Sequence, residues 1–259
     1  MQQKLFIHNR KKQKISVVIN TSSNQQGLVF IMHGLGGFKE QLHLNTIAET
    51  FKEEKFTTVL FDTTNSVGES DGSYQNATLT NYYEDLEDVI IWAGKQEFYQ
   101  QPFYLVGHSL GGISVTLFAE RNPKLIKGLA AFAPVVSGTL FVDNVPKEQL
   151  EYWDKTGWQI RESKSKGITL KLNWQQFKKD ILNYDLLEKA NKLTMPVLII
   201  VGEKDTSTPV EHQQKLFDKI PGKKELCIIK DAPHTFVKEE HLKQLRTIFK
   251  KWINKTQSI

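Results

Sequence analysis

The sequence predicts an α/β fold in which a mostly parallel sheet of eight strands is flanked by helices. Short apolar runs rich in β-branched residues alternate with segments of helical period along the chain, which is the pattern of a parallel sheet covered by helices. The 259 residues include 39% hydrophobic and 10% aromatic residues, enough to fill a large core. This composition excludes disordered, collagen-like and low-complexity chains.

Eight apolar runs are the strand candidates. A polar turn at 8–14 separates the first two runs, so we expect them to open the sheet as an antiparallel pair. The runs lie at 4–7, 15–19, 28–32, 57–62, 103–107, 129–135, 197–202 and 225–230.

Five segments have the spacing of helices that cover a sheet. Asn81 and Glu84 resemble a capping box, and Thr208 is a candidate N-cap before Pro209 at the first helical position. The predicted helices span 38–55, 81–97, 110–121, 209–220 and 239–255.

About sixty residues between the sixth and seventh strands of this sheet break the alternation, because one crossover needs only about a dozen. We therefore expect a core of residues 1–136 and 191–259 with a cap inserted at 137–190. Inside the cap, two strand-like runs flank the turn 164–167, with helix-forming stretches on both sides. No linker rich in Pro, Gly or Ser bounds the insertion, which favours a cap over an independent domain.

The positive charge does not indicate a nucleic-acid partner. The chain has 34 Lys and Arg against 29 Asp and Glu, a formal net charge of +5, but the two signs are interleaved. In the densest basic stretch, 238–255, apolar residues recur at helical spacing, so its lysines form the solvated face of an amphipathic helix. We expect no nucleic-acid binding, since no binding motif accompanies the charge.

The sequence lacks two kinds of segment that would indicate a membrane or secreted location. No run approaches the roughly 18 apolar residues of a membrane span, and no apolar run follows the basic N-terminal residues. We expect a soluble cytoplasmic protein with no stable membrane association. The single cysteine, Cys227, is interpreted as a packing residue in a strand, because one cysteine forms no internal disulfide or zinc cluster.

The strongest functional signal is the segment Gly-His-Ser-Leu-Gly at 107–111, which fits G-x-S-x-G directly after an apolar strand and before a helical segment. This pattern places the serine on a strained strand-to-helix turn that only small neighbours permit. The turn exposes the hydroxyl of Ser109, and the helix start offers the N–H of Leu110 to a developing oxyanion. Ser109 is therefore the predicted nucleophile.

A second glycine-rich turn, 33–37, ends an earlier strand. It lets the N–H of Leu35 point at the same oxyanion, so Leu35 and Leu110 are the predicted oxyanion-hole donors. A dinucleotide loop is excluded, since its pattern needs glycine where Lys39 stands. His33 lies inside this turn and is predicted to pack the loop.

A serine hydroxyl needs an imidazole within hydrogen-bond reach and a carboxylate that fixes its tautomer. Among seven histidines, His234 lies on a loop just after the last strand, while Asp205 lies on a turn after the preceding strand. The order Ser109, Asp205, His234 is that of nucleophile, acid and base in sheets that carry this serine turn. Asp231 is kept as the alternative acid, and Asp62 is interpreted as a structural residue that binds loop backbone.

These motifs together resemble the α/β-hydrolase superfamily over nearly the whole chain. Within it, the chain is most similar to small bacterial carboxylesterases of the cinnamoyl or feruloyl type and to serine aminopeptidase-like hydrolases. The resemblance implies the same triad and oxyanion donors. The chain departs from many relatives, which have an Arg-Gly pair where it has Asn65 and Ser66. The matching segments, in the family's order, are 33–37, 61–72, 107–112, 202–205 and 233–234.

We predict a serine hydrolase that cleaves small-molecule carboxylic esters, with short-chain or aryl (cinnamoyl-like) acyl groups as the first choice. The chemistry requires no metal and no organic cofactor. Trp153, Trp158 and Trp174 in the cap are candidates for an acyl pocket, although packing of the cap explains each of them equally well.

Several alternative functions are compatible with the same fold. A monoacylglycerol lipase or lysophospholipase would have a cap face apolar enough to touch lipid, whereas a thioesterase or peptidase would differ in its pocket. A catalytically silent binding protein is less favoured, because it has little reason to keep the triad and both glycine turns. The sequence leaves a homodimer open.

Overall fold

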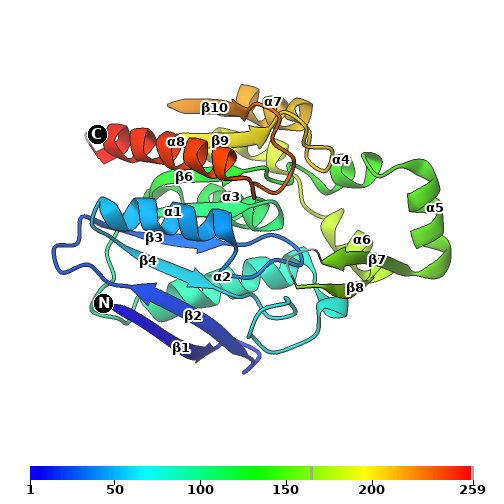
Figure 1. Ribbon diagram of the computed structural model, residues 1–259, viewed down its shortest axis with the longest axis horizontal. Helices are drawn as coiled ribbons and strands as arrows, with labels where there is room; N and C mark the ends of the chain where they lie inside the picture. Colours follow the sequence, from blue (N-terminus) through cyan, green and yellow to red (C-terminus); the bar gives the residue numbers. More distant parts are fainter. Residues whose placement is uncertain (164–165, 258–259) are drawn as a thin grey trace.

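A mostly parallel sheet of eight strands forms the centre of the computed structural model, which describes residues 1–163 and 166–257 (Figure 1). The strand order is β1-β2-β4-β3-β5-β6-β9-β10. β1 pairs antiparallel with β2 and β2 with β4, while all other neighbours in the sheet are parallel. This arrangement confirms the predicted fold class and the antiparallel opening pair. The strands are β1 (Gln2–His8), β2 (Lys14–Asn20), β3 (Gly27–Met32), β4 (Phe56–Phe61), β5 (Phe103–His108), β6 (Ile126–Phe132), β9 (Val197–Gly202) and β10 (Lys224–Ile229).

The inner strands are continuous apolar runs because both of their faces are covered. Every residue of β3, β4, β5 and β9 is buried, as expected for parallel strands between two helical layers. The edge strands differ, since β1 and β10 keep exposed apolar side chains such as Phe6 and Ile228. Because the inner strands are parallel, their carboxyl ends lie at one edge of the sheet, and the loops that follow them meet there.

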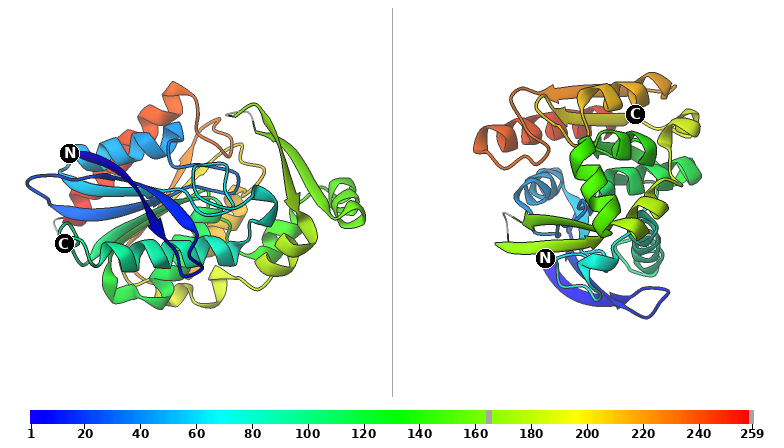
Figure 2. Two further views of the ribbon diagram at one scale, coloured as in Figure 1. Left: turned by 90° about the horizontal axis from the view of Figure 1, so that it is seen from below. Right: turned by 90° about the vertical axis from the view of Figure 1, so that its right-hand side faces the viewer.

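Helices cover the sheet in two layers, each with its own apolar core (Figures 1 and 2). α1 (Leu42–Glu53) and α8 (Glu239–Gln257) pack against one another on one face. α2 (Leu79–Ala93), α3 (Leu110–Arg121) and α7 (Val210–Lys219) cover the other face. All five predicted helices are present, and α3 has the predicted bounds. Across the described ranges, no helix combines the length and apolar character needed to cross a bilayer.

The predicted caps of two helices are wrong. α2 is capped by Thr78, whose hydroxyl accepts from the N–H of Asn81 at 3.1 Å, so Asn81 lies inside the helix. α7 begins after Pro209, and no side chain caps it. The hydroxyl of Thr208 caps no helix N–H and instead donates to the carboxylate of Asp205 at 3.0 Å.

The segment 137–190, which we call the insertion, lies between β6 and β9, beyond the carboxyl end of the sheet (Figures 1 and 2). β7 and β8 form an antiparallel hairpin, as predicted. Of the predicted turn 164–167, residues 164 and 165 lie outside the described residues. The elements of this region are α4 (Gly138–Asp143), α5 (Lys147–Thr156), β7 (Trp158–Ser163), β8 (Ile168–Asn173), α6 (Trp174–Ile181), η3 (Leu186–Glu188) and η4 (Ala190–Lys192), with the single turns η1 (Tyr74–Asn76) and η2 (Pro123–Leu125) in the core.

Candidate active site

Ser109 occupies the sharp turn between β5 and α3. Its backbone has φ 53° and ψ −115°, a strained conformation that non-glycine residues rarely adopt and that clusters at functional sites. Glycines on both sides make the turn possible, because a Cβ at Gly107 would collide with the carbonyl of Gly111. The N–H of Ser109 donates to the carbonyl of Phe132 at 3.1 Å, which ties the turn to β6.

The structure brings the three predicted triad residues together. His234 Nε2 lies 2.9 Å from Ser109 Oγ, and His234 Nδ1 lies 2.8 Å from Asp205 Oδ2. Asp205 follows β9 and His234 follows β10, two parallel neighbours. Their carboxyl ends lie at the same edge of the sheet as that of β5, from which β6 separates them. Both distances are within the reach that nucleophile, base and orienting acid need.

Asp205 is held as a charged hydrogen-bond acceptor. Its Oδ1 accepts from the N–H groups of Ser207 and Thr208, each at 2.9 Å, and its Oδ2 accepts from the hydroxyl of Thr208 and faces His234. Burial alone raises the pKa of this carboxyl, but the bond to His234 and the two backbone N–H groups outweigh it and hold the pKa below its ordinary value. A charged Asp205 can stabilise the imidazolium that forms when His234 takes a proton.

The other carboxylates considered in the sequence have different partners. Asp231 pairs with Lys204 at 2.5 Å on the surface, where half of its side chain is exposed. Asp62 is fully buried and accepts from the N–H and the ammonium of Lys39, each at 2.7 Å, and from the N–H of Glu69 at 2.9 Å. Asp62 thus binds loop backbone, which agrees with its structural interpretation.

The N–H groups of Leu35 and Leu110 are candidates to bind an oxyanion. Leu35 lies in the turn after β3, and Leu110 is the first residue of α3. Within residues 1–163 and 166–257, neither N–H donates to a protein acceptor. Each is therefore available to a ligand at the start of a helix or a tight turn, which is where oxyanion donors are found.

The peptide that carries the Leu35 N–H is fixed through the carbonyl of Gly34. This carbonyl accepts from His33 Nδ1 at 2.8 Å, from the hydroxyl of Tyr82 at 3.2 Å and from the N–H of Gly37 at 2.9 Å. The N–H of Thr63 donates to His33 Nε2 at 3.1 Å, so the ring carries its proton on Nδ1. Burial lowers the pKa of His33 and keeps it neutral. His33 therefore orders the loop, in line with its predicted packing role.

His108 has a contact that the sequence did not indicate. Its Nε2 donates to the carbonyl of His234 at 3.0 Å, and its ring stacks on Phe132 at 4.8 Å. Burial places the pKa of His108 well below its ordinary value, and that of the neighbouring His43 at about 3. The neutral ring of His108 thus connects the serine turn to the loop of the base. The motif gave no sign of this contact, because the two residues are distant in sequence.

The three tryptophans predicted to line an acyl pocket have different environments. Trp174 is fully buried, its Nε1 donates to Asp154 at 2.8 Å, and its ring lies 4.8 Å from that of Trp153, which is also buried. These two residues pack the insertion internally and present no surface to a substrate. Trp158 is partly exposed, with the ammonium of Lys171 4.0 Å from its ring centroid, so it alone of the three remains a candidate.

Asn65 and Ser66 stabilise the loop after β4 through local hydrogen bonds. Asn65 has φ 59°, and its side chain accepts from the N–H of Ser73 and donates to Asn81, both at 3.0 Å. The hydroxyl of Ser66 accepts from the N–H of Gly68 at 3.2 Å. Local hydrogen bonds therefore hold this loop without an Arg-Gly pair.

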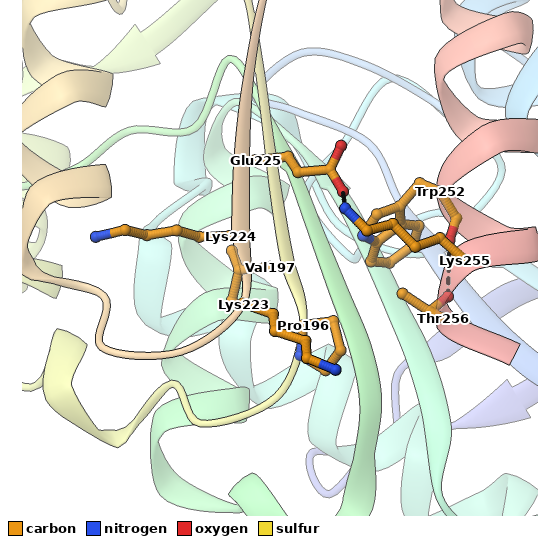
Figure 3. Close-up of a pocket in the computed structure, with 8 residues that line it drawn as sticks. All are labelled: Pro196, Val197, Lys223, Lys224, Glu225, Trp252, Lys255 and Thr256. Carbon is orange, nitrogen blue, oxygen red and sulfur yellow. Dashed lines mark hydrogen bonds and ion pairs between the residues drawn. The ribbon is translucent and has the colours of Figure 1, made fainter. Parts of the chain in front are cut away.

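A cavity of about 360 Å³ lies away from the triad (Figure 3). It is at the amino ends of β9 and β10, whereas Asp205 and His234 follow the carboxyl ends, so it takes no part in the candidate site. In the part of the chain that the structure describes, no three His, Cys, Asp or Glu side chains are grouped to hold a metal ion. The cavity is lined by Pro196, Val197, Lys223, Lys224, Glu225, Trp252, Lys255 and Thr256.

The sheet order and the serine turn identify the protein as an α/β hydrolase, and comparison with known proteins gives the family. The sequence matches the model of the family described as serine aminopeptidase, S33, over residues 23–171, more than half of the chain. The chain therefore belongs to this hydrolase family. A second family model, described as PhoPQ-activated pathogenicity-related protein, matches residues 103–258.

Individual relatives agree with this assignment. An uncharacterized 31.7 kDa protein of the traX-finO intergenic region of Escherichia coli is 31% identical over 239 residues, covering 80% of this chain and 82% of the relative. Esterase EstD of Thermotoga maritima is 26% identical over 180 residues, 63% of this chain and 42% of that protein. Est1E of Butyrivibrio proteoclasticus, solved with ferulic acid bound, superposes with a TM-score of 0.83 at 23% identity, covering 98% and 100% of the two chains. Together they indicate a hydrolase of the α/β fold.

Proposed function

We propose that the protein is a serine esterase that cleaves carboxylic esters through Ser109, His234 and Asp205. The observation that carries this proposal is the continuous hydrogen-bonded chain from Ser109 Oγ through the His234 ring to Asp205, with distances of 2.9 and 2.8 Å. A serine hydroxyl on a strained turn, next to an imidazole oriented by a buried carboxylate, is the arrangement that makes serine nucleophilic.

The reaction then follows from the geometry in two halves. Ser109 Oγ attacks the acyl carbonyl while His234 Nε2 takes its proton, and the oxyanion that forms faces the N–H groups of Leu35 and Leu110. The intermediate collapses, His234 returns the proton to the leaving alcohol, and Ser109 keeps the acyl group. Water, deprotonated by the same imidazole, releases the acid and restores the serine.

The proposed substrates are small esters with short-chain or aryl acyl groups, selected by the insertion acting as a cap. Two relatives support this choice, since one is named an esterase and the structure of another contains ferulic acid. The insertion also lies at the carboxyl end of the sheet, next to the loops that carry the triad (Figure 1).

A lipid ester is the second candidate, and one observation favours it. The insertion carries four exposed apolar side chains, which could contact an acyl chain or a lipid surface. Their exposed fractions lie between 45% and 55%, and they are Tyr152, Ile160, Ile168 and Leu182.

Hydrolysis of p-nitrophenyl esters from acetate to palmitate, with methyl ferulate alongside, separates the two candidates. The proposal expects turnover on acetate, butyrate and methyl ferulate that falls steeply with longer chains and disappears in Ser109→Ala. A long-chain optimum would move the assignment to a lipid ester. The absence of turnover on every ester would contradict the esterase proposal.

A further inference from the structure

The hairpin of the insertion contacts the turn that carries Leu35. From β7, Arg161 Nη2 donates to the carbonyl of Leu35 at 2.6 Å, and Nε donates to the hydroxyl of Tyr74 in η1 at 3.2 Å. The guanidinium carbon lies 5.7 Å from the centroid of the Tyr74 ring. A hydrogen bond from a guanidinium to a carbonyl is charge-assisted and stronger than a neutral one. The insertion thus bonds directly to the turn of the proposed oxyanion hole.

Close packing at Gly36 shows that this contact is tight. Gly36 has φ +66°, and a Cβ at this position would collide with the Arg161 guanidinium. The same Cβ would lie 3.1 Å from Leu170 Cδ1 and 3.2 Å from Tyr74 Cε2. The backbone conformation favours glycine here, and a larger residue would displace the Arg161 guanidinium from its place against the turn. The turn at Leu35 and Gly36 therefore lies directly against β7, β8 and η1.

The N–H of Leu35 is consequently flanked by two fixed carbonyls. On one side, the Gly34 carbonyl accepts from His33, Tyr82 and Gly37, all residues of the core. On the other side, the Leu35 carbonyl accepts from Arg161, a residue of the insertion. The Gly34 bonds hold the peptide plane that contains the N–H, and the Arg161 bond holds the next plane along the chain. Together they limit rotation of the Leu35 N–H, and an oxyanion donor contributes most when it is already oriented before reaction.

We infer that Arg161 is a positioning residue of the oxyanion hole, so that the insertion contributes to the rate of the reaction as well as covering the site. The inference rests on the proposed function. Arg161 acts through the Leu35 peptide, and the positive charge of its guanidinium adds to the field that favours an oxyanion at this position. Loss of Arg161 should therefore lower the rate for every ester alike, because the oxyanion is common to all of them.

The test compares Arg161→Ala, Arg161→Lys and Tyr74→Phe with wild type on p-nitrophenyl acetate, p-nitrophenyl butyrate and methyl ferulate. Arg161→Ala is expected to lower kcat about tenfold on all three esters with KM changed less than twofold, since losing an oxyanion donor itself costs about a hundredfold or more. The rate constant for labelling by a fluorophosphonate should fall by the same factor. Arg161→Lys should be intermediate, because an ammonium cannot make both bonds of the planar fork. Tyr74→Phe should lose about twofold.

The matched control is Lys147→Ala, which removes an exposed cation from α5 of the same insertion. It should leave kcat and the rate constant for labelling unchanged. The melting temperatures of all variants should stay within a few degrees of wild type. If wild type is active and Arg161→Ala keeps the same kcat, the inference about Arg161 is overturned while the proposed function stands. A loss confined to KM, or to one of the three esters, would also overturn it and assign Arg161 to substrate binding. A wild type without turnover on any ester would overturn the proposed function itself.

Discussion

The carboxyl end of the core sheet and the insertion differ in how the contacts of their side chains arise. In the core, Ser109, Asp205 and His234 each follow the carboxyl end of a parallel strand, and the loops that begin there bring the three side chains within 2.9 Å of their hydrogen-bond partners. In the insertion, Trp153 and Trp174 are used for internal packing, while the charged Arg161 reaches the turn that carries Leu35. The position of a side chain next to a strand end therefore depends on residues nearby in sequence. The contacts of a side chain in the insertion depend instead on the distant residues against which it packs.

The largest effect expected in the core is that of Asp205→Asn. The amide can still accept from Ser207 and Thr208, so the fold should persist, but His234 loses the partner that fixes its tautomer and stabilises its charged form. We expect kcat to fall roughly ten-thousandfold, as in other serine triads. Steady-state hydrolysis of p-nitrophenyl acetate measures it.

Asp231→Asn is the matched control for this variant. It removes an acid from the same region, but the structure pairs Asp231 with Lys204 at the surface. Activity should stay within about twofold of wild type, because exposed ion pairs contribute little. If Asp231→Asn were the inactive variant, the acid would have been assigned to the wrong residue.

The contrast between packing and function inside the insertion is tested by Trp174→Ala. Trp174 is fully buried against Trp153 and Phe177 and donates to Asp154, so its loss should lower the free energy of unfolding by about 3 to 5 kcal/mol. Urea unfolding measures this change.

Trp158→Ala provides the comparison, because Trp158 is only partly buried. It should cost less stability than Trp174→Ala and change the preference between acyl groups more. Equal losses of stability in the two variants would remove the distinction between the packing tryptophans and the one that faces solvent.

The smallest effect concerns Glu120, near the end of α3, where the core adjoins the segment 185–189. Burial raises the pKa of its carboxyl to about 8, and its Oε1 has no hydrogen-bond partner in the described residues. The ordinary pKa of 4.5 applies to the unfolded state, so the folded state holds this proton more tightly. The protonated carboxyl therefore stabilises the folded state fully below about pH 4.5, and this stabilisation is lost as the pH rises through 8.

Glu120→Gln should remove this dependence. Between pH 6 and pH 9, wild type should lose about 3 kcal/mol more unfolding free energy than the variant. Urea titrations of both proteins at the two pH values provide the measurement. Parallel pH profiles would mean that Glu120 ionises at its ordinary pKa.

The sequence predicted most of the fold and selected the three residues that the structure brings together, because both depend on local signals. Apolar runs located the eight strands, and G-x-S-x-G fixed the conformation of Ser109, since only glycine at Gly107 and Gly111 leaves room for the turn. The length between two strands was sufficient to predict an insertion. Helix starts were less certain, because Thr78 and Asn81 are both good caps and tertiary bonds decided between them.

The rest of the site depended on contacts between distant residues. Arg161 is 126 residues away from Leu35 in sequence, and His108 is 126 residues away from the carbonyl it binds. No periodicity or motif connects such pairs. For the tryptophans, an aromatic residue in a cap fits a pocket and a packed interior equally well, and only burial separated the two.

The most direct test of the central claim is covalent labelling with a fluorophosphonate, followed by intact mass and peptide mapping. We expect one adduct per chain, located on Ser109, with no adduct in Ser109→Ala and strongly slowed labelling in His234→Ala. Labelling needs no knowledge of the natural ester, so it tests the nucleophile by itself. A folded wild-type protein that stays unmodified, or an adduct on another residue, would contradict the assignment of Ser109 as an activated nucleophile.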